Sequence, residues 1–269
     1  MWAENPAKAA AERWWLIYTP IWGISVGAVM LSGWAERWGD VECLTFGATM
    51  MLGASLPMIR PHPSERALPW TRRSGVKLTL SVVLLAFGMN YAQTPFFFDV
   101  LHMHYGFAVG WTIDRNPIFL YLLTVAYFAT YCALCLVTLR LVRPRLAPAL
   151  RWLAWILAPL AMAGLETALN ANPFVDALFC YDDLPFMLWF GTPVYAFAFV
   201  VSLPVWMAID EDSVGALPMR MVFVYCAAAL FADWLFLELV RELVAPSFTT
   251  VIDHAPGLRD VDASCLAPR

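Results

Sequence analysis

The segment RWLAWILAPLAMAGLETALN, residues 151–170, decides the class of this fold. It is almost entirely apolar, and about twenty helical residues rise roughly 30 Å, which is the thickness of the hydrocarbon core of a bilayer. Glu166 interrupts the segment near its end. Because a carboxylate is costly in hydrocarbon, such a residue is expected to face the protein interior and to serve a function. The segment therefore predicts a transmembrane helix that carries a functional acid.

The composition extends this prediction to the whole chain. Hydrophobic residues make up 61% of the 269 residues and charged residues only 14%. A soluble domain is far less apolar, and windows of about nineteen residues locate further candidate spans. We predict an all-α polytopic membrane protein of about seven transmembrane helices with a short N-terminal interfacial helix. The expected spans cover residues 14–33, 44–59, 77–98, 117–139, 152–170, 185–209 and 218–243.

One integral membrane domain accounts for the chain, because no linker or repeat interrupts the apolar pattern. The expected parts are an interfacial helix at 1–13, a seven-span bundle at 14–243 and a polar C-terminal tail at 244–269. Asn5 and Pro6 are typical of a helix start, and Trp14 and Trp15 are expected at the level of the lipid headgroups. Cys132 and Cys135 stand one turn apart in an apolar span without a nearby histidine, and all six cysteines are expected to be small buried side chains.

The basic residues predict the orientation. Of the 17 Lys and Arg residues, 12 fall in the N-terminal segment or in the loops after the second, fourth and sixth spans. The positive-inside rule places this side in the cytoplasm and the C-terminus outside, with membrane lipid as a partner. Basic residues form no stripe, which excludes nucleic acid. The Ala-, Leu- and Arg-rich composition favours a bacterial cytoplasmic membrane; a eukaryotic protein of this kind is expected in the endoplasmic reticulum.

Four polar residues interrupt the odd-numbered spans, which all run in the same direction. Asn90, Glu166, Asp233 and Glu238 lie late in the third, fifth and seventh of these spans, so we expect them in the same leaflet. The loops that follow the third and fifth spans would roof this half of the bundle. Each residue also has a structural interpretation: Glu238 has the spacing for an ion pair with Arg241, Asp233 could bridge helices, and Asn90 could join them.

Metal binding is not predicted. The chain has four histidines and no HExxH or similar spacing, and His102 and His104 fall in an expected loop.

Short segments along the chain resemble plant cycloeucalenol cycloisomerases. The resemblance rests on the order and spacing of several motifs, and it runs nearly end to end. These motifs are WAENPAK at 2–8, YTPIW at 18–22, NY at 90–91, LET at 165–167, VSLP at 201–204, DE at 210–211, and an acid, Arg and Pro pattern at 238, 241 and 246.

The resemblance implies a sterol isomerase that opens the 9β,19-cyclopropane ring of a sterol such as cycloeucalenol and forms obtusifoliol. An acid must protonate the methylene bridge, and a base must then remove a neighbouring proton from the cation. Apolar surroundings favour the neutral form of a carboxyl, which suits Glu166 to the role of the acid. Glu238 is our choice for the base or electrostatic partner, and Asp233 is the reserve. No cofactor and no metal are required.

The expected substrate site combines aromatic and amide groups. Aromatic faces stabilise positive charge, and Tyr18, Trp22, Tyr91 and Tyr195 lie in spans where they could line a flat sterol pocket. The sterol 3-hydroxyl could bind Asn90 or Asn172, and the sequence does not rank the two.

The chain departs from the plant pattern at four positions. Where the plant enzymes carry histidines in the third and fourth spans, this sequence has Pro95, Ile118, Val125 and Cys132. A histidine mechanism at these positions is therefore not expected. Two alternatives stay open: a lipid or sterol receptor or transporter with seven spans, and a sterol double-bond isomerase that uses the same acid and base chemistry. The exact sterol and the oligomeric state are also open.

Overall fold

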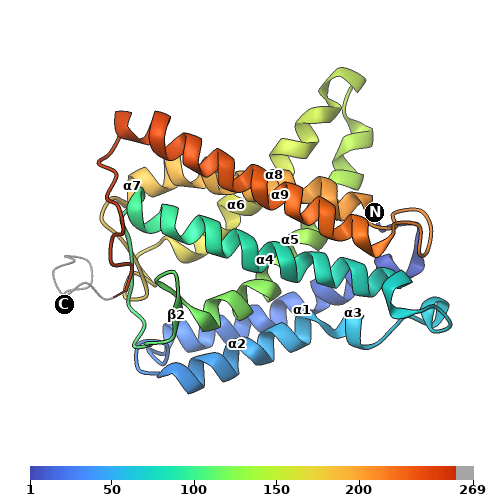
Figure 1. The fold of residues 1–269 in the computed structure, drawn as a ribbon, viewed down its shortest axis with the longest axis horizontal. Helices are drawn as coiled ribbons and strands as arrows, with labels where there is room; N and C mark the ends of the chain where they lie inside the picture. The colour runs from blue at the N-terminus through green and yellow to red at the C-terminus, as the bar shows by residue number, and fades with distance from the viewer. Residues whose placement is uncertain (259–269) are drawn as a thin grey trace.

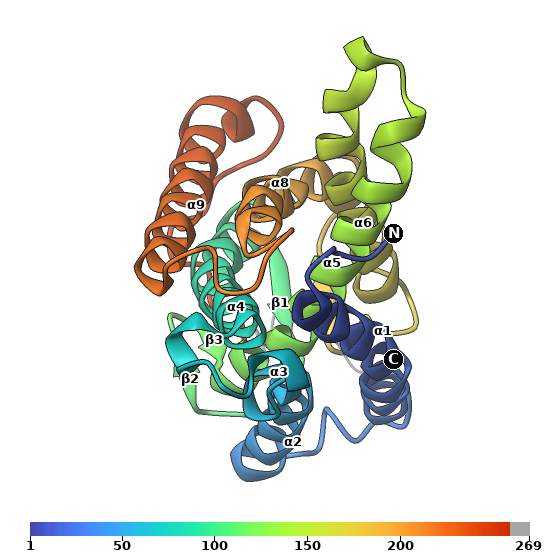
Figure 2. The same ribbon diagram turned by 90° about the vertical axis from the view of Figure 1, so that its right-hand side faces the viewer.

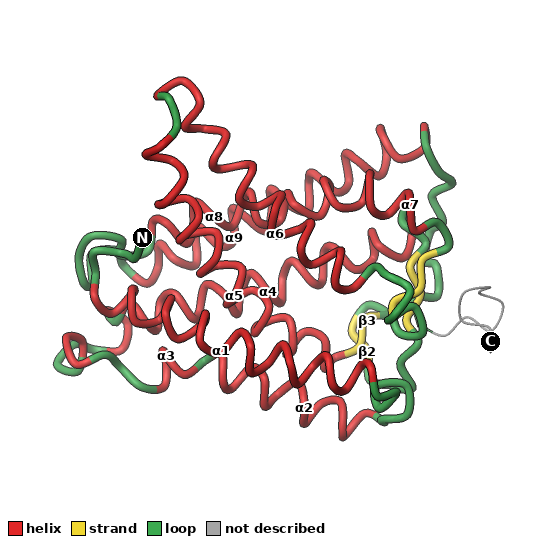
Figure 3. Tube along the Cα trace, turned by 180° about the vertical axis from the view of Figure 1, so that it is seen from behind, coloured by secondary structure: helices red, strands yellow, loops and turns green. Residues whose placement is uncertain are grey.

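A computed structural model of the protein describes residues 1–258, and these residues form a bundle of long helices with small strands at one end (Figures 1 and 3). Six helices are long and apolar enough to cross a membrane. The prediction of an all-α polytopic membrane protein is confirmed. Among the described residues these six contain α1 (Pro6–Leu31), α4 (Ser74–Asp99), α5 (Ile118–Val142), α6 (Ala154–Asn170), α8 (Thr192–Ala208) and α9 (Met219–Leu239). The shorter helix α2 (Asp40–Ala54) packs against α5 and is not one of the six.

The span expected at 44–59 is not one continuous helix. It consists of α2, with 15 residues, and the single turn α3 (Leu56–Ile59). Pro57 explains the break, because proline cannot donate to the carbonyl four residues earlier and its ring clashes with that carbonyl. The indole N–H groups of Trp14 and Trp15 occupy the freed carbonyls, donating to Gly53 and Ala54 at 2.9 and 2.8 Å. Both indoles therefore join α1 to α2.

The expected interfacial helix at 1–13 is not a separate element, because α1 continues without a break from Pro6 to Leu31. The helix start agrees with the prediction: Pro6 lies in the first turn, and the Asn5 side chain accepts from the N–H groups of Ala7 and Lys8. Lys8 is fully buried. A buried charged residue of this kind requires partners inside the protein.

A buried network of charges supplies these partners at the end of the bundle that holds the N-terminus. Lys8 Nζ lies 2.7 Å from Glu211, and Arg140 binds both Glu211 and Glu12, the latter at 2.8 Å. Glu211 lies in the loop between α8 and α9. Burial opposes its charge, but hydrogen bonds from Arg140 and Lys8 hold the pKa of Glu211 below its ordinary value. The network joins α1, α5 and the α8–α9 loop.

A second pair extends the network to α4. Lys77 forms an ion pair with Asp210, and the Ser74 hydroxyl donates to the same carboxylate at 2.7 Å. The Asn5 amide in turn donates to Ser74 at 2.9 Å. The WAENPAK and DE segments of the sequence thus meet in three dimensions.

Short strands and loops roof the opposite end of the bundle (Figure 3). β1 (Met103–Tyr105) pairs antiparallel with β4 (Phe179–Tyr181), and β2 (Thr112–Ile113) pairs with β3 (Asn116–Pro117). The chain beyond α9 continues through the turns η6 (Val240–Val244) and η7 (Ala245–Ser247). Residues up to 258 then pack on the roof, where the Tyr105 N–H donates to Gly257.

Short helices complete the connections. Between α3 and α4 lie η1 (Pro63–Glu65) and η2 (Trp70–Arg72), and α7 (Leu184–Phe186) and η5 (Met187–Gly191) lead into α8. The turns η3 (Arg143–Arg145) and η4 (Pro148–Leu153) join α5 to α6 in a hairpin that projects from the bundle (Figures 1 and 2). In the end-on view of Figure 2, α9 lies at the edge and α5 near the middle. Accordingly α5 packs against α1, α2, α4, α6 and α8.

The cysteines differ from the prediction at one position. Cys43, Cys132, Cys135 and Cys226 are buried free thiols, whereas Cys180 in β4 is disulfide-bonded. Cys265 lies outside the described residues.

Candidate functional site

A large cavity lies beneath the roof, in the half of the bundle that the polar residues of the odd-numbered spans were predicted to share. It has about 1150 Å³ of space free of protein atoms, its open mouth included. Residues from α1, α2, α4, α5, α6 and α8 form its wall, and β1 and β4 cover it. The lining is mostly aliphatic and aromatic, which suits a flat apolar ligand.

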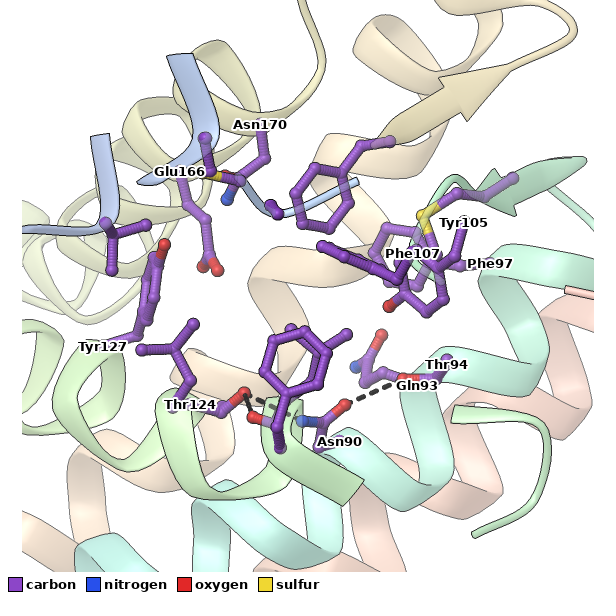
Figure 4. Close-up of a pocket in the computed structure, with 18 of the residues that line it drawn as sticks. Asn90, Gln93, Thr94, Phe97, Tyr105, Phe107, Thr124, Tyr127, Glu166 and Asn170 are labelled. Carbon is purple, nitrogen blue, oxygen red and sulfur yellow. Dashed lines mark hydrogen bonds between the residues drawn. The ribbon is translucent and has the colours of Figure 1, made fainter. Parts of the chain in front are cut away.

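Glu166 is the only charged side chain among the described residues that line the cavity. It projects from α6 into the space, as Figure 4 shows. The Tyr195 hydroxyl of α8 donates to its carboxyl group, and Tyr131 of α5 also hydrogen-bonds to it. The cavity thus contains one carboxyl whose position is fixed by two phenols.

The backbone that carries Glu166 is itself held in place. The next residue, Thr167, accepts a hydrogen bond from Thr192 of α8 at 3.1 Å. This bond fixes the end of α6 against the start of α8, so the carboxyl and Tyr195 keep their relative position. Asn170, one turn beyond Glu166, lines the cavity near it (Figure 4).

A hydrogen-bonded cluster on α4 and α5 forms the opposite wall (Figure 4). The Asn90 amide donates to Thr124 at 2.8 Å, and its carbonyl accepts from Thr94 at 2.8 Å and from Asn116 at 2.7 Å. Gln93 lies beside this cluster and lines the cavity. Its amide nitrogen donates to both carboxylate oxygens of Asp233 on α9, at 3.0 and 3.2 Å.

Two tyrosines of the roof face the cavity. Burial raises the pKa of Tyr105 and Tyr181 well above the ordinary value, so both phenols stay neutral. The polar residues of the neighbouring loops tie the roof together instead of lining the cavity. Arg115 pairs with Asp99 at 2.7 Å, and His104 lies 3.3 Å from Asp182.

The structure brings three of the predicted residues to the cavity wall: Glu166, Asn90 and Tyr195. Asp233 is fully buried behind Gln93 and does not line the cavity. Gln93 therefore separates this carboxyl from any ligand in the cavity.

Glu238 lies away from the cavity, and the expected ion pair with Arg241 does not form. Arg241 binds Asp253 and lies 3.5 Å from Asp99 and 4.0 Å from Glu242. The chain beyond α9 explains the difference, because it folds back over the roof and offers Arg241 these acids. Within residues 1–258, Glu238 has no ion pair.

Tyr18 and Trp22 pack between helices and do not line the cavity. The Tyr18 hydroxyl donates to the Met50 carbonyl at 3.1 Å, and the Trp22 indole donates to Thr130 at 3.0 Å. A β-carbon on Gly53 would lie 2.3 Å from the Tyr18 ring, so only glycine lets α2 approach α1 this closely.

Tyr91 and Asn172 also lie outside the cavity wall. Tyr91 is 53% exposed on the outer face of α4. The Asn172 amide donates to the carbonyls of Ala168 and Leu169, at 3.1 and 2.8 Å, and so satisfies the end of α6.

Sequence reasoning missed several polar residues of the wall. Gln93 and Thr94 follow Asn90 by three and four positions, which places them on the same helical face, so helical periodicity could have identified them. Asn170 follows Glu166 by four positions and gave the same signal, whereas Thr124 and Tyr127 gave none. Among the described residues, no group of three or more His, Cys, Asp and Glu side chains could hold a metal ion.

Comparisons with known proteins agree with the resemblance in the sequence. No protein-family model matches the chain, and no solved structure matches it. The chain is similar to the cycloeucalenol cycloisomerase of Arabidopsis thaliana, with 31% identity over 254 residues that cover 91% of this chain and 89% of the plant protein. At this identity and coverage, the chain belongs to the cycloeucalenol cycloisomerase family.

Proposed function

We propose that the protein isomerises a cyclopropyl sterol of the cycloeucalenol type and that Glu166 is its catalytic acid. The single observation that carries this proposal is a lone carboxyl that projects into a large apolar cavity within the membrane-spanning bundle. The name of the plant relative supplies the substrate class. The cavity volume and its aromatic lining support a rigid, flat ligand.

Glu166 has the position that protonation of a strained carbon requires. A general acid must be neutral, must face the substrate and must be held in place. Apolar walls favour the neutral carboxyl, and the hydrogen bonds from Tyr195 and Tyr131 fix its orientation. The proton would move from Glu166 to the methylene carbon of the cyclopropane. One of the two bonds that join this carbon to the sterol rings would break, which leaves a methyl group on one ring carbon and the positive charge on the other.

The cation that forms would be surrounded by aromatic rings. Tyr127, Phe97 and Phe107 line the cavity together with Tyr195. The faces of these rings carry partial negative charge and stabilise a cation within about 6 Å, with an energy of about 2 kcal/mol where water is excluded. The lining would therefore lower the barrier without forming a covalent bond.

The carboxylate of Glu166 is also our choice for the base, in place of Glu238. After the first transfer it is the only anion that the described lining residues provide. It would take a proton from the carbon next to the cation, which leaves a ring double bond and restores the neutral acid. One proton enters the sterol and one leaves, so the substrate and product have the same formula.

Replacement of Glu166 by Gln tests the acid. The amide keeps the size of the side chain but has no transferable proton, and general acid catalysis contributes about 10²- to 10⁴-fold to the rate. We expect purified Glu166→Gln to lose turnover of cycloeucalenol by this factor, as followed by mass spectrometry and proton NMR. Glu238→Gln is the matched control and should keep most of the wild-type turnover. A Glu166→Gln variant with more than about a tenth of wild-type turnover would contradict the assignment.

Deuterated water distinguishes one carboxyl from two. With an acid and a separate base, every product methyl gains one deuteron from solvent. If Glu166 returns the proton that it removed, methyl labelling over several turnovers falls below one deuteron. A methyl without any solvent-derived label, even in the first turnover of enzyme equilibrated in deuterated water, would exclude protonation by an exchangeable acid. A protein that binds the sterol and leaves it unchanged would favour the receptor or transporter interpretation.

A further inference from the structure

Gln93 has a buried oxygen for which the protein provides no hydrogen bond. The residue is 3% exposed and lines the cavity, and its Oε1 atom has no hydrogen-bond partner among residues 1–258. A buried amide oxygen without a partner costs about 1–3 kcal/mol, so such atoms generally have a function. Figure 4 shows Gln93 on the wall opposite Glu166.

Asp233 determines which end of the Gln93 amide faces the cavity. The two carboxylate oxygens of Asp233 accept from Gln93 Nε2 at 3.0 and 3.2 Å. Because the amide nitrogen of Gln93 faces Asp233, the amide oxygen is left toward the cavity (Figure 4). The cavity therefore presents an acceptor at this point, and the complementary ligand group is a donor such as a hydroxyl.

The neighbouring polar groups are already committed. Asn90 Oδ1 accepts two hydrogen bonds, and the Thr94 hydroxyl donates one of them. The Thr124 hydroxyl donates to the Leu120 carbonyl at 2.6 Å. Asn172, the other sequence candidate for the sterol hydroxyl, is bound to the end of α6. Asn116 Oδ1 also lacks a partner, but Asn116 does not line the cavity. Among the described lining residues of this wall, Gln93 is thus the one whose amide oxygen remains without a hydrogen bond.

We propose that Gln93 Oε1 accepts the hydrogen bond of the sterol hydroxyl and anchors the polar end of the substrate opposite Glu166. This assignment rests on the proposed function and adds to it a binding residue that replaces Asn90 and Asn172. Asp233 acts through Gln93 and is a positioning residue. The site recognises a donor and disfavours a carbonyl at the same position, because two acceptors would then face each other.

The test compares cycloeucalenol with its 3-ketone, which has the same skeleton and lacks the donor. We expect wild-type protein to show a KM for the ketone about tenfold or more above that for the alcohol. With the ketone, both Gln93 Oε1 and the ketone oxygen are acceptors, so neither forms a hydrogen bond. Gln93→Met fills the same space without hydrogen bonding and should bring the two KM values together. Asp233→Asn lets the Gln93 amide turn either its oxygen or its nitrogen to the cavity, so this variant should also reduce the difference between the two KM values. Ser81→Ala, which removes a buried hydroxyl from the same helix, is the control and should keep the wild-type ratio.

The outcomes separate this inference from the proposed function. Equal KM values for the two sterols in wild-type protein would overturn the inference, because a water molecule would then satisfy Gln93. A wild-type ratio in Gln93→Met would overturn it as well. If Gln93→Met does not fold, the two sterols with wild-type protein still decide the question. If neither sterol is isomerised, quenching of tryptophan fluorescence still reports whether the alcohol binds more tightly than the ketone.

Discussion

At the scale of single residues, the hydrogen bond from Tyr195 to Glu166 is the contact most directly tied to the proposed chemistry. The two side chains come from different helices, and Tyr195 also packs edge-on against Phe97 and Phe199, with ring centroids 5.6 and 5.2 Å away. These rings hold the phenol in place. In the proposed mechanism, Tyr195 orients the carboxyl and stabilises it after it has lost its proton.

We predict that Tyr195→Phe lowers kcat about 10- to 100-fold and leaves KM for the sterol nearly unchanged. The ring and its packing remain, but the carboxylate loses one charge-assisted hydrogen bond, which contributes about 1.5–3 kcal/mol. Steady-state kinetics with cycloeucalenol measures both parameters. Tyr225→Phe, which changes a tyrosine of α9 outside the cavity lining, is the control. A rise in KM with constant kcat would show instead that Tyr195 binds substrate.

Sequence reasoning selected Glu166, which lines the cavity, because an acid in an apolar span is conspicuous. It paired Glu238 with Arg241, and this ion pair does not form, because the partner of Arg241 is decided by the chain that folds back over the roof and periodicity within one helix does not describe that contact. Tyr18 and Trp22 do not line the cavity for a similar reason: a span contains many aromatic residues, and only the packing of α2 and α5 against α1 shows which of them are enclosed.

At the scale of elements, the break in α2 and the buried charges of α1 are the features that hydropathy did not predict. A hydropathy window averages over about nineteen residues and cannot detect a stop at Pro57 or an ion pair at Lys8. The segments that carry the family resemblance include Lys8 and Glu211, which meet at the end of the bundle away from the cavity. Their role is to hold helices together.

We predict that Glu211→Gln destabilises the protein at neutral pH by about 3 kcal/mol, because Lys8 and Arg140 lose a charged partner in a buried setting. The pKa of Glu211 is depressed in the folded state, so its stabilisation is present above the unfolded value near 4.3 and is lost as pH falls through the folded value. The difference from wild type should therefore be largest at neutral pH and shrink below about pH 4. Thermal unfolding in detergent at several pH values measures it.

The control for this experiment is Glu242→Gln, since the Glu242 side chain is 71% exposed and contacts Arg241 only at 4.0 Å. It should change the unfolding temperature little at any pH. An equal effect of both substitutions would mean that net charge, and not the buried network, sets the stability.

At the scale of the whole molecule, the two ends of the bundle contain different features. One end holds the buried ion pairs and most of the basic loops, and the other holds the cavity and its roof. The distribution of Lys and Arg predicts that the first end faces the cytoplasm.

Cysteine labelling tests this orientation. Thr250 and Ser64 are both exposed, and they lie at opposite ends of the bundle. We therefore expect Thr250→Cys to react with an impermeant thiol reagent in intact cells. Ser64→Cys should react only after the cells are permeabilised. The free thiols Cys43, Cys132, Cys135 and Cys226 are buried, which keeps their background low, and the parent protein measures what remains. The reverse labelling pattern would invert the orientation and leave the site unchanged.

The presence of a single carboxyl among the described residues that line the cavity has a consequence for the energetics of the membrane. If Glu166 both gives and recovers the proton, each catalytic cycle begins and ends with the same charge on the same side of the bilayer. No ion crosses the membrane, so the transmembrane potential can neither drive the reaction nor be dissipated by it. The direction of the isomerisation is then set by the difference in free energy between the strained sterol and its product.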